Sequence, residues 1–272
     1  SSPARHPWCR ECRQKIQHRP VSFPDLKDRS VFITGGGSGI GAALTEGFLR
    51  QGAKVAFVQR SDATGFCDRM ERDTGLRPLF LPCDITDISA LEAALADAAE
   101  SHGPVTVLVN NAADDTRHTI ADTGVADWDR SIAVNLRPHF FTVRAALPGM
   151  IAAGGGSVIN FSSITYLMGL GGLPAYVASK AAITGLTRAQ ARELGHHRIR
   201  VNAVLPGWVL TERQLNLWAT PEALDEFLPK QCLPEHLYPD DMVGVTLFLA
   251  SDSSRMMTGQ ALVVDGGVVV TG

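Results

Sequence analysis

From Ser30 onward, short apolar segments rich in β-branched residues alternate with longer segments of helical periodicity. The expected strands are Ser30–Thr34, Lys54–Gln59, Leu79–Pro82, Val105–Asn110, Ser157–Ser162, Arg200–Leu205 and Ala261–Asp265. Several of these segments are apolar almost throughout, which is typical of strands covered on both faces. Strict alternation of strand and helix predicts βαβ units with right-handed crossovers. We therefore expect an α/β fold with a parallel sheet of about seven strands and about six helices.

The chain reads as a single domain with a distinct N-terminal segment. No repeat and no low-complexity linker interrupts residues 25–272. Residues 1–24 are polar, Arg-rich and nearly free of acidic residues, and they lack the apolar core of a secretory signal. We interpret them as a flexible leader, a transit-like segment or an addition from expression.

Cysteine usage gives two weak indications. Cys9 and Cys12 form a C-x-x-C pair that His6 and His18 could complete as a zinc site, but the spacing fits no zinc pattern well. We therefore favour a tail without metal. The five cysteines are odd in number and scattered, which argues against a disulfide framework and predicts a cytoplasmic protein.

The charge balance limits the classes of partner. The formal net charge is −3, so no basic excess points to nucleic acid or to an anionic membrane surface. No apolar run reaches the roughly 18 residues that a membrane-spanning helix requires. These observations favour a small-molecule ligand.

A glycine-rich turn follows the first expected strand. Gly35, Gly39 and Gly41 give the spacing G-x-x-x-G-x-G, and an expected helix begins within the turn. Glycine allows the backbone to turn tightly and to approach a pyrophosphate, while the helix offers free N–H groups to that anion. The position between strand and helix predicts dinucleotide binding in a Rossmann-type, doubly wound sheet.

The end of the second expected strand bears on cofactor choice. NAD would favour a carboxylate there, but Gln59 and Arg60 occupy the place. An arginine can pair with the 2′-phosphate of NADP, so NADP is favoured and NAD stays possible. Asp62 lies close by in the sequence, and a small change of register at the end of this strand could bring its carboxylate to the ribose. Asp84 follows the third strand and could accept from the adenine amino group or serve as a turn residue.

Tyr176 and Lys180 are four residues apart, which places both on one face of a helix. A nearby ammonium would stabilise a tyrosine phenolate and lower the tyrosine pKa toward neutrality. Ser163 lies thirteen residues earlier, at the carboxyl end of an expected strand, where open α/β sheets bind ligands. Its hydroxyl could hold the substrate oxygen, with Ser162 as the competing candidate.

Together these motifs resemble the short-chain dehydrogenase/reductase family. The resemblance covers about Asp25 to Gly267 and rests on the glycine turn, Asn110-Asn111-Ala112-Ala113, Asn135, Ser163, Tyr176-x-x-x-Lys180 and Pro206-Gly207. The family pattern usually has glycine where this chain has Ala113. The resemblance implies an NAD(P)-dependent oxidoreductase that moves a hydride between a substrate carbon and nicotinamide.

The resemblance also implies residue roles. Catalysis would use Asn135, Ser163, Tyr176 and Lys180, with Asn135 holding a water that relays protons to Lys180. Asn111 would help to bind the adenosine side of the cofactor, and Val209 and Thr211 would bond the nicotinamide carboxamide. The full set of expected cofactor contacts is Gly35, Ser38, Gly39, Ile40, Gly41, Arg60, Asp84, Ile85, Asn111, Ala112, Tyr176, Lys180, Pro206, Gly207, Val209 and Thr211.

A finer likeness concerns the substrate. The stretches 114–118, 127–130, 135–137 and 230–233 are similar to bacterial aldose 1-dehydrogenases of the D-xylose and D-galactose type. This likeness implies oxidation of a cyclic sugar at its anomeric carbon to a lactone. Residues 210–238 form the expected lid, and Asp114 and Asp115 could be turn residues. The candidate sugar contacts are Thr165, Tyr166, Trp208, Arg213, Gln214 and Trp218.

Two other functions stay open at this stage. The same chemistry could act on another ketone, a polyol or a 3-oxoacyl thioester. A nucleotide-sensing protein without catalysis is the remote alternative, although Ser163, Tyr176 and Lys180 are all present. The resemblance further implies a homo-oligomer, either a tetramer or a dimer, in which the apolar run Val268–Val270 could be buried.

Overall fold

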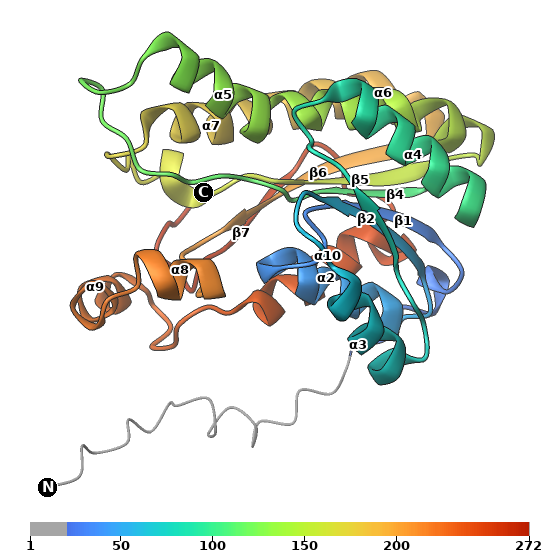
Figure 1. Cartoon of the computed structure of the whole chain (residues 1–272), viewed down its shortest axis with the longest axis horizontal. Coiled ribbons are helices and arrows are strands. Elements are labelled where there is room, and N and C mark those ends of the chain that lie inside the picture. The colour runs from blue at the N-terminus through green and yellow to red at the C-terminus, as the bar shows by residue number, and fades with distance from the viewer. Residues whose placement is uncertain (1–20, 272) are drawn as a thin grey trace, which may run out of the picture.

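The computed structural model describes residues 21–271, and the fold is one parallel sheet covered by helices on both faces (Figure 1). The strand order is β3-β2-β1-β4-β5-β6-β7. The strands are β1 (Ser30–Thr34), β2 (Lys54–Gln59), β3 (Leu79–Pro82), β4 (Val107–Asn110), β5 (Gly156–Phe161), β6 (Ile199–Pro206) and β7 (Ala261–Val264). The predicted doubly wound α/β fold is confirmed.

The main helices form two layers. On one face lie α2 (Gly39–Arg50), α3 (Thr64–Thr74) and α10 (Val243–Ala250). The other face carries α4 (Ile88–His102), α5 (Val125–Asn135), α6 (Arg137–Ala152) and α7 (Pro174–Leu194). Pro138 near the start of α6 explains why α5 and α6 are separate helices, since a proline has no N–H to donate to the carbonyl four residues earlier and its ring clashes with that carbonyl.

The strand order places the ligand-binding edge. The chain runs outward from β1 to β3 and then returns to β4, which pairs with the opposite edge of β1, with Thr34 in register with Asn110. At such a reversal the loops after β1 and β4 diverge and leave a crevice at the carboxyl ends of the strands. The glycine turn and Asn111 therefore meet there.

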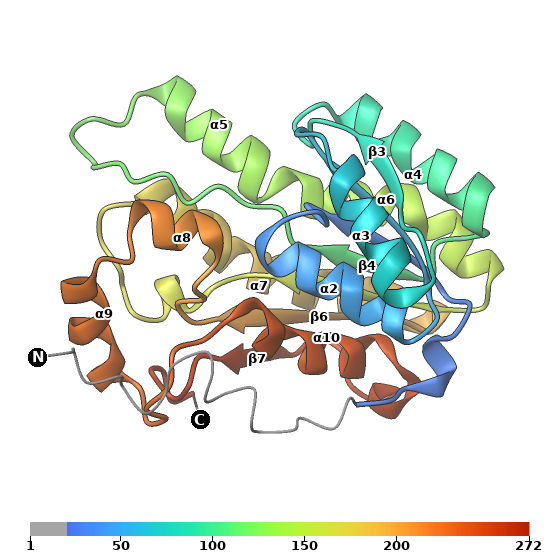
Figure 2. The ribbon, with the colours of Figure 1, turned by 60° about the horizontal axis from the view of Figure 1, so that its bottom comes forward.

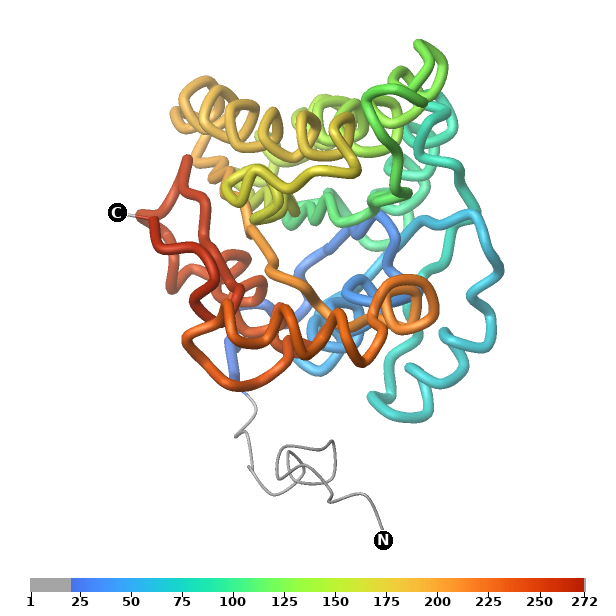
Figure 3. The backbone as a smooth tube through the Cα atoms, turned by 90° about the vertical axis from the view of Figure 1, so that its left-hand side faces the viewer, coloured from blue at the N-terminus to red at the C-terminus, as the bar shows by residue number. Residues whose placement is uncertain are grey.

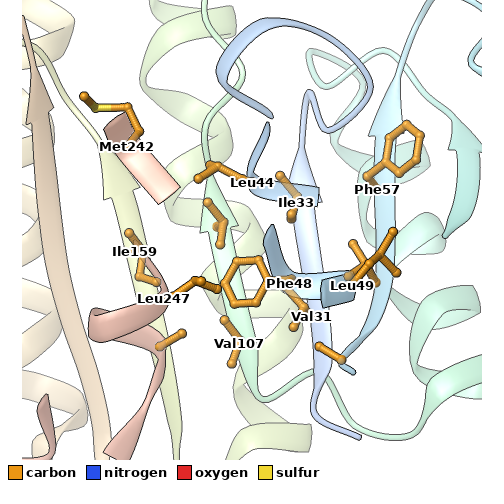
Figure 4. Packing of buried hydrophobic residues seen from close by; sticks show 14 of the residues in the cluster. Val31, Ile33, Leu44, Phe48, Leu49, Phe57, Val107, Ile159, Met242 and Leu247 are labelled. Carbon is orange, nitrogen blue, oxygen red and sulfur yellow. The ribbon is translucent and has the colours of Figure 1, made fainter. Parts of the chain in front are cut away.

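Alternate residues of each strand serve opposite faces. Val31 and Ile33 of β1 pack with Leu44 and Phe48 of α2, as Figure 4 shows. Phe32 between them belongs to the second cluster, which α4, α6 and α7 cover. Burial on both faces is the physical reason why the strands are apolar throughout.

The bounds of four predicted strands differ from the structure by one or two residues, and β5 and β7 end one residue earlier than predicted, at Phe161 and Val264. The fourth strand begins at Val107 instead of Val105, and the sixth extends to Pro206. Val21 and Phe23 fall in the predicted leader, yet Phe23 N–H donates to Gln51 Oε1 at 2.8 Å and Gln51 Nε2 donates to Val21 O at 3.0 Å. The predicted Cys9–Cys12 pair lies outside the described residues.

The segment predicted as a lid leaves the sheet after β6 and returns beside it. It contains α8 (Glu212–Leu217) and α9 (Pro221–Phe227), which lie together at one end of the molecule (Figures 2 and 3). Val209 pairs with Leu237 in an isolated bridge that closes the base of the segment. Short 3-10 helices occur at Pro24–Leu26, Ile164–Tyr166, Gly195–His197, Leu228–Lys230, Pro239–Met242 and Asp252–Ser254.

Within residues 21–271, none of the helices is both long and apolar enough to cross a membrane.

Candidate active site

A pocket of about 530 Å³ lies at the carboxyl ends of β4, β5 and β6, and three of the four predicted catalytic residues, Ser163, Tyr176 and Lys180, line it together. Ser163 follows β5, while Tyr176 and Lys180 lie one turn apart on α7. Pro174 at the start of α7 suits the first turn, where its missing N–H costs no hydrogen bond. The local sequence therefore starts α7 so that Tyr176 lies in its first turn, beside the end of β5.

The structure distinguishes the two neighbouring serines. Ser162 Oγ donates to the Lys180 carbonyl at 2.6 Å, so this hydroxyl ties β5 to α7. Ser163 Oγ accepts from Thr165 N–H at 3.2 Å and also forms a hydrogen bond with the Tyr176 side chain, which acts to lower the tyrosine pKa. Ser163 is therefore the serine that bonds to Tyr176, and its catalytic role stays a prediction.

Lys180 is buried, with a relative exposure of 1%, and its Nζ donates to the Phe161 carbonyl at 2.9 Å. The ammonium lies 5.4 Å from the centroid of the Tyr176 ring. Burial lowers the pKa of Lys180 to about 7, although the carboxylate of Asp115 acts in the opposite direction. The lysine therefore titrates near neutrality in the protein without cofactor.

The Tyr176 pKa departs from the sequence expectation. Burial raises the pKa of Tyr176 above its usual value, and the carboxylate of Asp115 adds to that rise. The expectation that the tyrosine pKa is lowered is therefore wrong for the protein alone. The physical reason is that desolvation disfavours the phenolate more than the surrounding donors favour it.

Asn135, the fourth predicted catalytic residue, does not line the pocket. Its Oδ1 accepts from Asp114 N–H at 2.8 Å, and its Nδ2 donates to Asp114 O at 3.0 Å. These bonds fasten the loop after β4 to the end of α5. His139, one turn beyond, is 1% exposed. Burial lowers the pKa of His139 to about 3, with the Lys180 charge as a further cause, so its ring is neutral.

The glycine turn is shaped to receive a phosphate group. A Cβ at Gly41 would lie 1.8 Å from Gly35 O, and one at Gly35 would lie 3.2 Å from Ala112 Cα. Gly35 and Gly39 also have positive φ values of 71° and 51°. No side chain caps α2 at Ser38, so its first N–H groups can bind an anion. The cradle therefore fits a dinucleotide pyrophosphate.

Asn111 holds the turn in place from β4. Its Nδ2 donates to Thr34 O at 3.1 Å and to Gly35 O at 3.3 Å, and its backbone N–H donates to Thr34 Oγ1 at 3.0 Å. The side chain thus acts first on the protein backbone, whereas the family resemblance had assigned it to the cofactor.

Of the residues expected to select between NAD and NADP, Gln59 and Asp62 are hydrogen-bonded to nearby backbone, whereas Arg60 is exposed. Gln59 Oε1 accepts from Gly37 N–H at 3.0 Å, and its Nε2 donates to Ser61 O at 3.0 Å. Asp62 Oδ1 accepts from Thr64 N–H at 3.2 Å, which holds it at the start of α3. Arg60 is exposed and has no ion-pair partner within residues 21–271, so its guanidinium is available.

The third-strand carboxylate forms a turn. Asp84 Oδ1 accepts from Thr86 N–H at 2.9 Å, and these bonds to Thr86 lower the Asp84 pKa. Asp87, not Asp84, caps α4, accepting from Ala90 N–H at 3.0 Å. Ile85 beside it is buried.

The segment after β6 forms another side of the pocket. Pro206, Gly207, Val209 and Thr211 line it, and a Cβ at Gly39 would lie 3.2 Å from Thr211 Cγ2. The lid base therefore meets the phosphate turn, and Ile40 at the start of α2 lines the same pocket. These residues could hold the nicotinamide end of a bound cofactor.

The predicted substrate residues divide into two groups. Thr165, Trp208, Arg213 and Gln214 line the pocket. Tyr166 lines a separate cavity near α7 and β7, where its hydroxyl accepts from Thr184 Oγ1 at 3.1 Å. Trp218 lies behind the wall with Arg117 over its ring at 5.0 Å, and its Nε1 has no partner in the described residues.

Among the pocket residues that were not predicted from the sequence are two charged ones on the loop after β4. Arg117 and Asp115 both line the wall, although Asp115 had been interpreted as a turn residue. Their position two to four residues after Ala113, on the loop that leaves β4, was the available signal. No group of three or more potential metal ligands occurs in the described part of the chain.

Comparisons with known proteins show which proteins the chain is similar to. A family model described as enoyl-(acyl carrier protein) reductase matches residues 35–269. A "probable galactose dehydrogenase" of Rhizobium meliloti is 50% identical over 90% of this chain and 97% of that protein. A D-xylose 1-dehydrogenase of Caulobacter vibrioides is 45% identical over the same shares. The crystal structure of a 3-oxoacyl-acyl-carrier-protein reductase from Brucella melitensis has a TM-score of 0.85 at 32% identity, covering 92% of this chain and 94% of that one.

Proposed function

The chain belongs to the short-chain dehydrogenase/reductase family and is an NAD(P)-dependent oxidoreductase, and from this premise we propose that it oxidises an aldose at C1 to the lactone. The observation that carries the proposal is the pocket in which Ser163, Tyr176 and Lys180 meet beside polar side chains of the lid. Names of relatives at 45–50% identity support the sugar.

Within the pocket each residue has a distinct task. The nicotinamide cofactor, when bound, supplies the acceptor for the hydride of the substrate carbon. Ser163 donates a hydrogen bond to the substrate oxygen, and Tyr176 as phenolate accepts the proton of the substrate hydroxyl. Because burial raises the Tyr176 pKa, the ammonium of Lys180 is needed to stabilise the phenolate.

Proton removal completes the cycle. Asn135 would help to return protons from Lys180 to solvent through water. Asn135 is buried beside the loop after β4, and its side-chain amide oxygen and nitrogen both bond to the Asp114 backbone. These bonds hold Asn135 in a fixed position, which supports the proposed role. This role stays a prediction.

NADP is the cofactor we favour. Gln59 and Asp62 are engaged with the backbone of Gly37 and Thr64, while the Arg60 guanidinium is free to pair with a 2′-phosphate. The remainder of the cofactor would be bound by the glycine turn, Asn111, Asp84, Ile85 and the Pro206–Thr211 segment. NAD stays possible.

Sugar contacts are proposed for the pocket residues Thr165, Trp208 and Arg213. Tyr166 and Trp218, also predicted from sequence, would act indirectly, since neither lines the pocket. Trp208 presents an aromatic surface whose indole Nε1–H donates to Gln214 Oε1 at 3.0 Å, so its ring is fixed for contact with a sugar face.

A homo-oligomer, either a tetramer or a dimer, is also proposed. β7 is an edge strand with one unpaired side, and Val270 beyond it is 88% exposed. Light scattering after size exclusion would give the mass of the assembly. A monomer at micromolar concentration would contradict this part of the proposal.

The decisive experiment follows nicotinamide absorbance with NAD and NADP against a panel of aldoses, polyols and secondary alcohols. We expect turnover with a pentose or hexose and a preference for NADP. Activity only on a ketone or a 3-oxoacyl thioester in the reductive direction would leave the family assignment intact and overturn the aldose proposal.

A further inference from the structure

Asp115 is the only acidic residue among those that line the pocket. Among the charged groups that act on Tyr176 it has the largest effect on the tyrosine pKa, and it also acts to raise the pKa of Lys180. Its carboxylate lies on the loop after β4 and lines the same pocket as Tyr176 and Lys180.

Two bonds from the lid orient this carboxylate. Arg213 Nε donates to Oδ1 at 3.2 Å, and Gln214 Nε2 donates to Oδ2 at 2.7 Å. Gln214 is itself fixed by the bond from Trp208 Nε1. A carboxylate has about four lone-pair sites, so each oxygen of Asp115 keeps one acceptor site free.

A second polar group, on the β5 side of the same pocket, lacks a hydrogen-bond partner among residues 21–271. Thr165 Oγ1 is buried and forms no hydrogen bond within the described part of the chain, although Thr165 lines the pocket two residues after Ser163. A buried hydroxyl without a partner is costly, and a ligand hydroxyl would satisfy it. Asp115 and Thr165 thus present an acceptor and a hydroxyl beside the place where Ser163 and Tyr176 hold the reacting oxygen.

We propose that Asp115 is a specificity-determining residue that accepts a hydrogen bond from a substrate hydroxyl on the carbon next to the one oxidised. The enzyme would then select vicinal oxygens, as in a cyclic aldose with a free C2 hydroxyl. The inference deepens the proposed function and, in its aldose form, rests on it.

The neighbouring Asp114 offers a matched control. Its Oδ1 accepts from Thr116 N–H at 3.0 Å and from Arg213 Nη2 at 3.0 Å, so it shares a partner with Asp115. It does not line the pocket. The two carboxylates are therefore alike in sequence position and ion pairing and differ in access to the substrate.

The test compares each aldose with its 2-deoxy analogue in the wild type, Asp115→Asn and Asp114→Asn. A hydrogen bond to a charged group contributes roughly 1.5–3 kcal/mol, so the wild type should favour the aldose about 10- to 150-fold in kcat/KM. Asp115→Asn should reduce that ratio at least about fivefold, while Asp114→Asn should leave it within about twofold. Asp115→Ala provides a second variant if the amide form folds poorly, as judged by circular dichroism.

Two outcomes would overturn the inference. One is an equal loss of kcat/KM on both substrates in Asp115→Asn, which would mean that Asp115 acts on Tyr176 or the fold and not on the second hydroxyl. The other is a change of ratio in Asp114→Asn as large as in Asp115→Asn.

A non-sugar pair separates this inference from the proposed function. If the wild type oxidises no aldose, the proposed function fails, and the same variants are measured on trans-cyclohexane-1,2-diol and cyclohexanol. A preference for the diol that depends on Asp115 supports the inference, and its absence overturns it.

Discussion

The two sides of the pocket are held by different forces. On the side of β5 and α7, Ser163 and Lys180 are 7% and 1% exposed, and Ser162 and Lys180 donate to backbone carbonyls at 2.6 and 2.9 Å. On the opposite side the loop after β4 meets α8 through Arg213, whose side chain is 49% exposed in its pairs with Asp114 and Asp115.

This difference determines which side can move. Losing a buried hydrogen bond leaves an unsatisfied group at a cost of about 1–3 kcal/mol, whereas an exposed ion pair contributes roughly 0.2–1 kcal/mol. The β5–α7 side is therefore a fixed platform for chemistry. The α8 side can open for substrate at small cost, and variants on the two sides should differ in kind as well as in size.

The largest effect is expected for Tyr176→Phe on the fixed side. Loss of a positioned proton acceptor should lower kcat by roughly 10²–10⁴-fold, effectively abolishing turnover. Cofactor affinity, measured by quenching of tryptophan fluorescence, should stay nearly unchanged. A variant with full activity would remove Tyr176 from the mechanism.

The serine pair tests the fixed side further. Ser163→Ala should lower kcat by roughly 10²–10³-fold with an unchanged melting temperature, because it removes a donor to the reacting oxygen. Ser162→Ala should lower the free energy of unfolding by about 1 kcal/mol through loss of its bond to the Lys180 carbonyl. Kinetics and thermal melts of both variants check the assignment, and exchanged results would reverse the roles of the two serines.

Lys180→Met should stabilise the protein while removing activity. Burial holds the Lys180 pKa at about 7 against a usual value of 10.5, so the unfolded chain binds more protons between these values. This residue therefore makes stability rise with pH across that window, and its charge lowers stability below about pH 7. We expect a gain of about 0.5–2 kcal/mol at pH 6, measured by urea unfolding without cofactor. A lower free energy of unfolding for Lys180→Met at pH 6 would contradict the expectation that burying the Lys180 ammonium destabilises the protein.

The same contrast explains what the sequence could and could not predict. Local periodicity was enough to predict all seven strands. Fixed spacing was enough to predict the glycine turn and to bring Ser163, Tyr176 and Lys180 together. Those features lie on the buried side, where backbone geometry and burial leave few alternatives. The choice of Ser163 over Ser162 also followed from spacing, and the hydrogen bonds explain it.

The missed features depend on contacts between distant segments. Asp115 meets Arg213 and Gln214, which lie 98 and 99 residues later in the chain. The raised Tyr176 pKa depends on burial, which a short motif does not encode. Tyr166 follows a reacting strand in sequence, yet the 3-10 turn at Ile164–Tyr166 directs it toward Thr184 and away from the pocket.

The smallest effect is expected for Arg213→Gln on the mobile side. Two carboxylates neutralise the guanidinium at 3.0 and 3.2 Å, so its loss should weaken the α8 contact by less than about 1 kcal/mol. We expect KM for the sugar to rise by no more than about fivefold with kcat unchanged. Added salt should raise KM in the wild type by screening these pairs, and this dependence should be lost in the variant. A fall in kcat as large as that of Ser163→Ala would mean that Arg213 contacts the reacting atoms, and the two sides of the pocket would then share the chemistry.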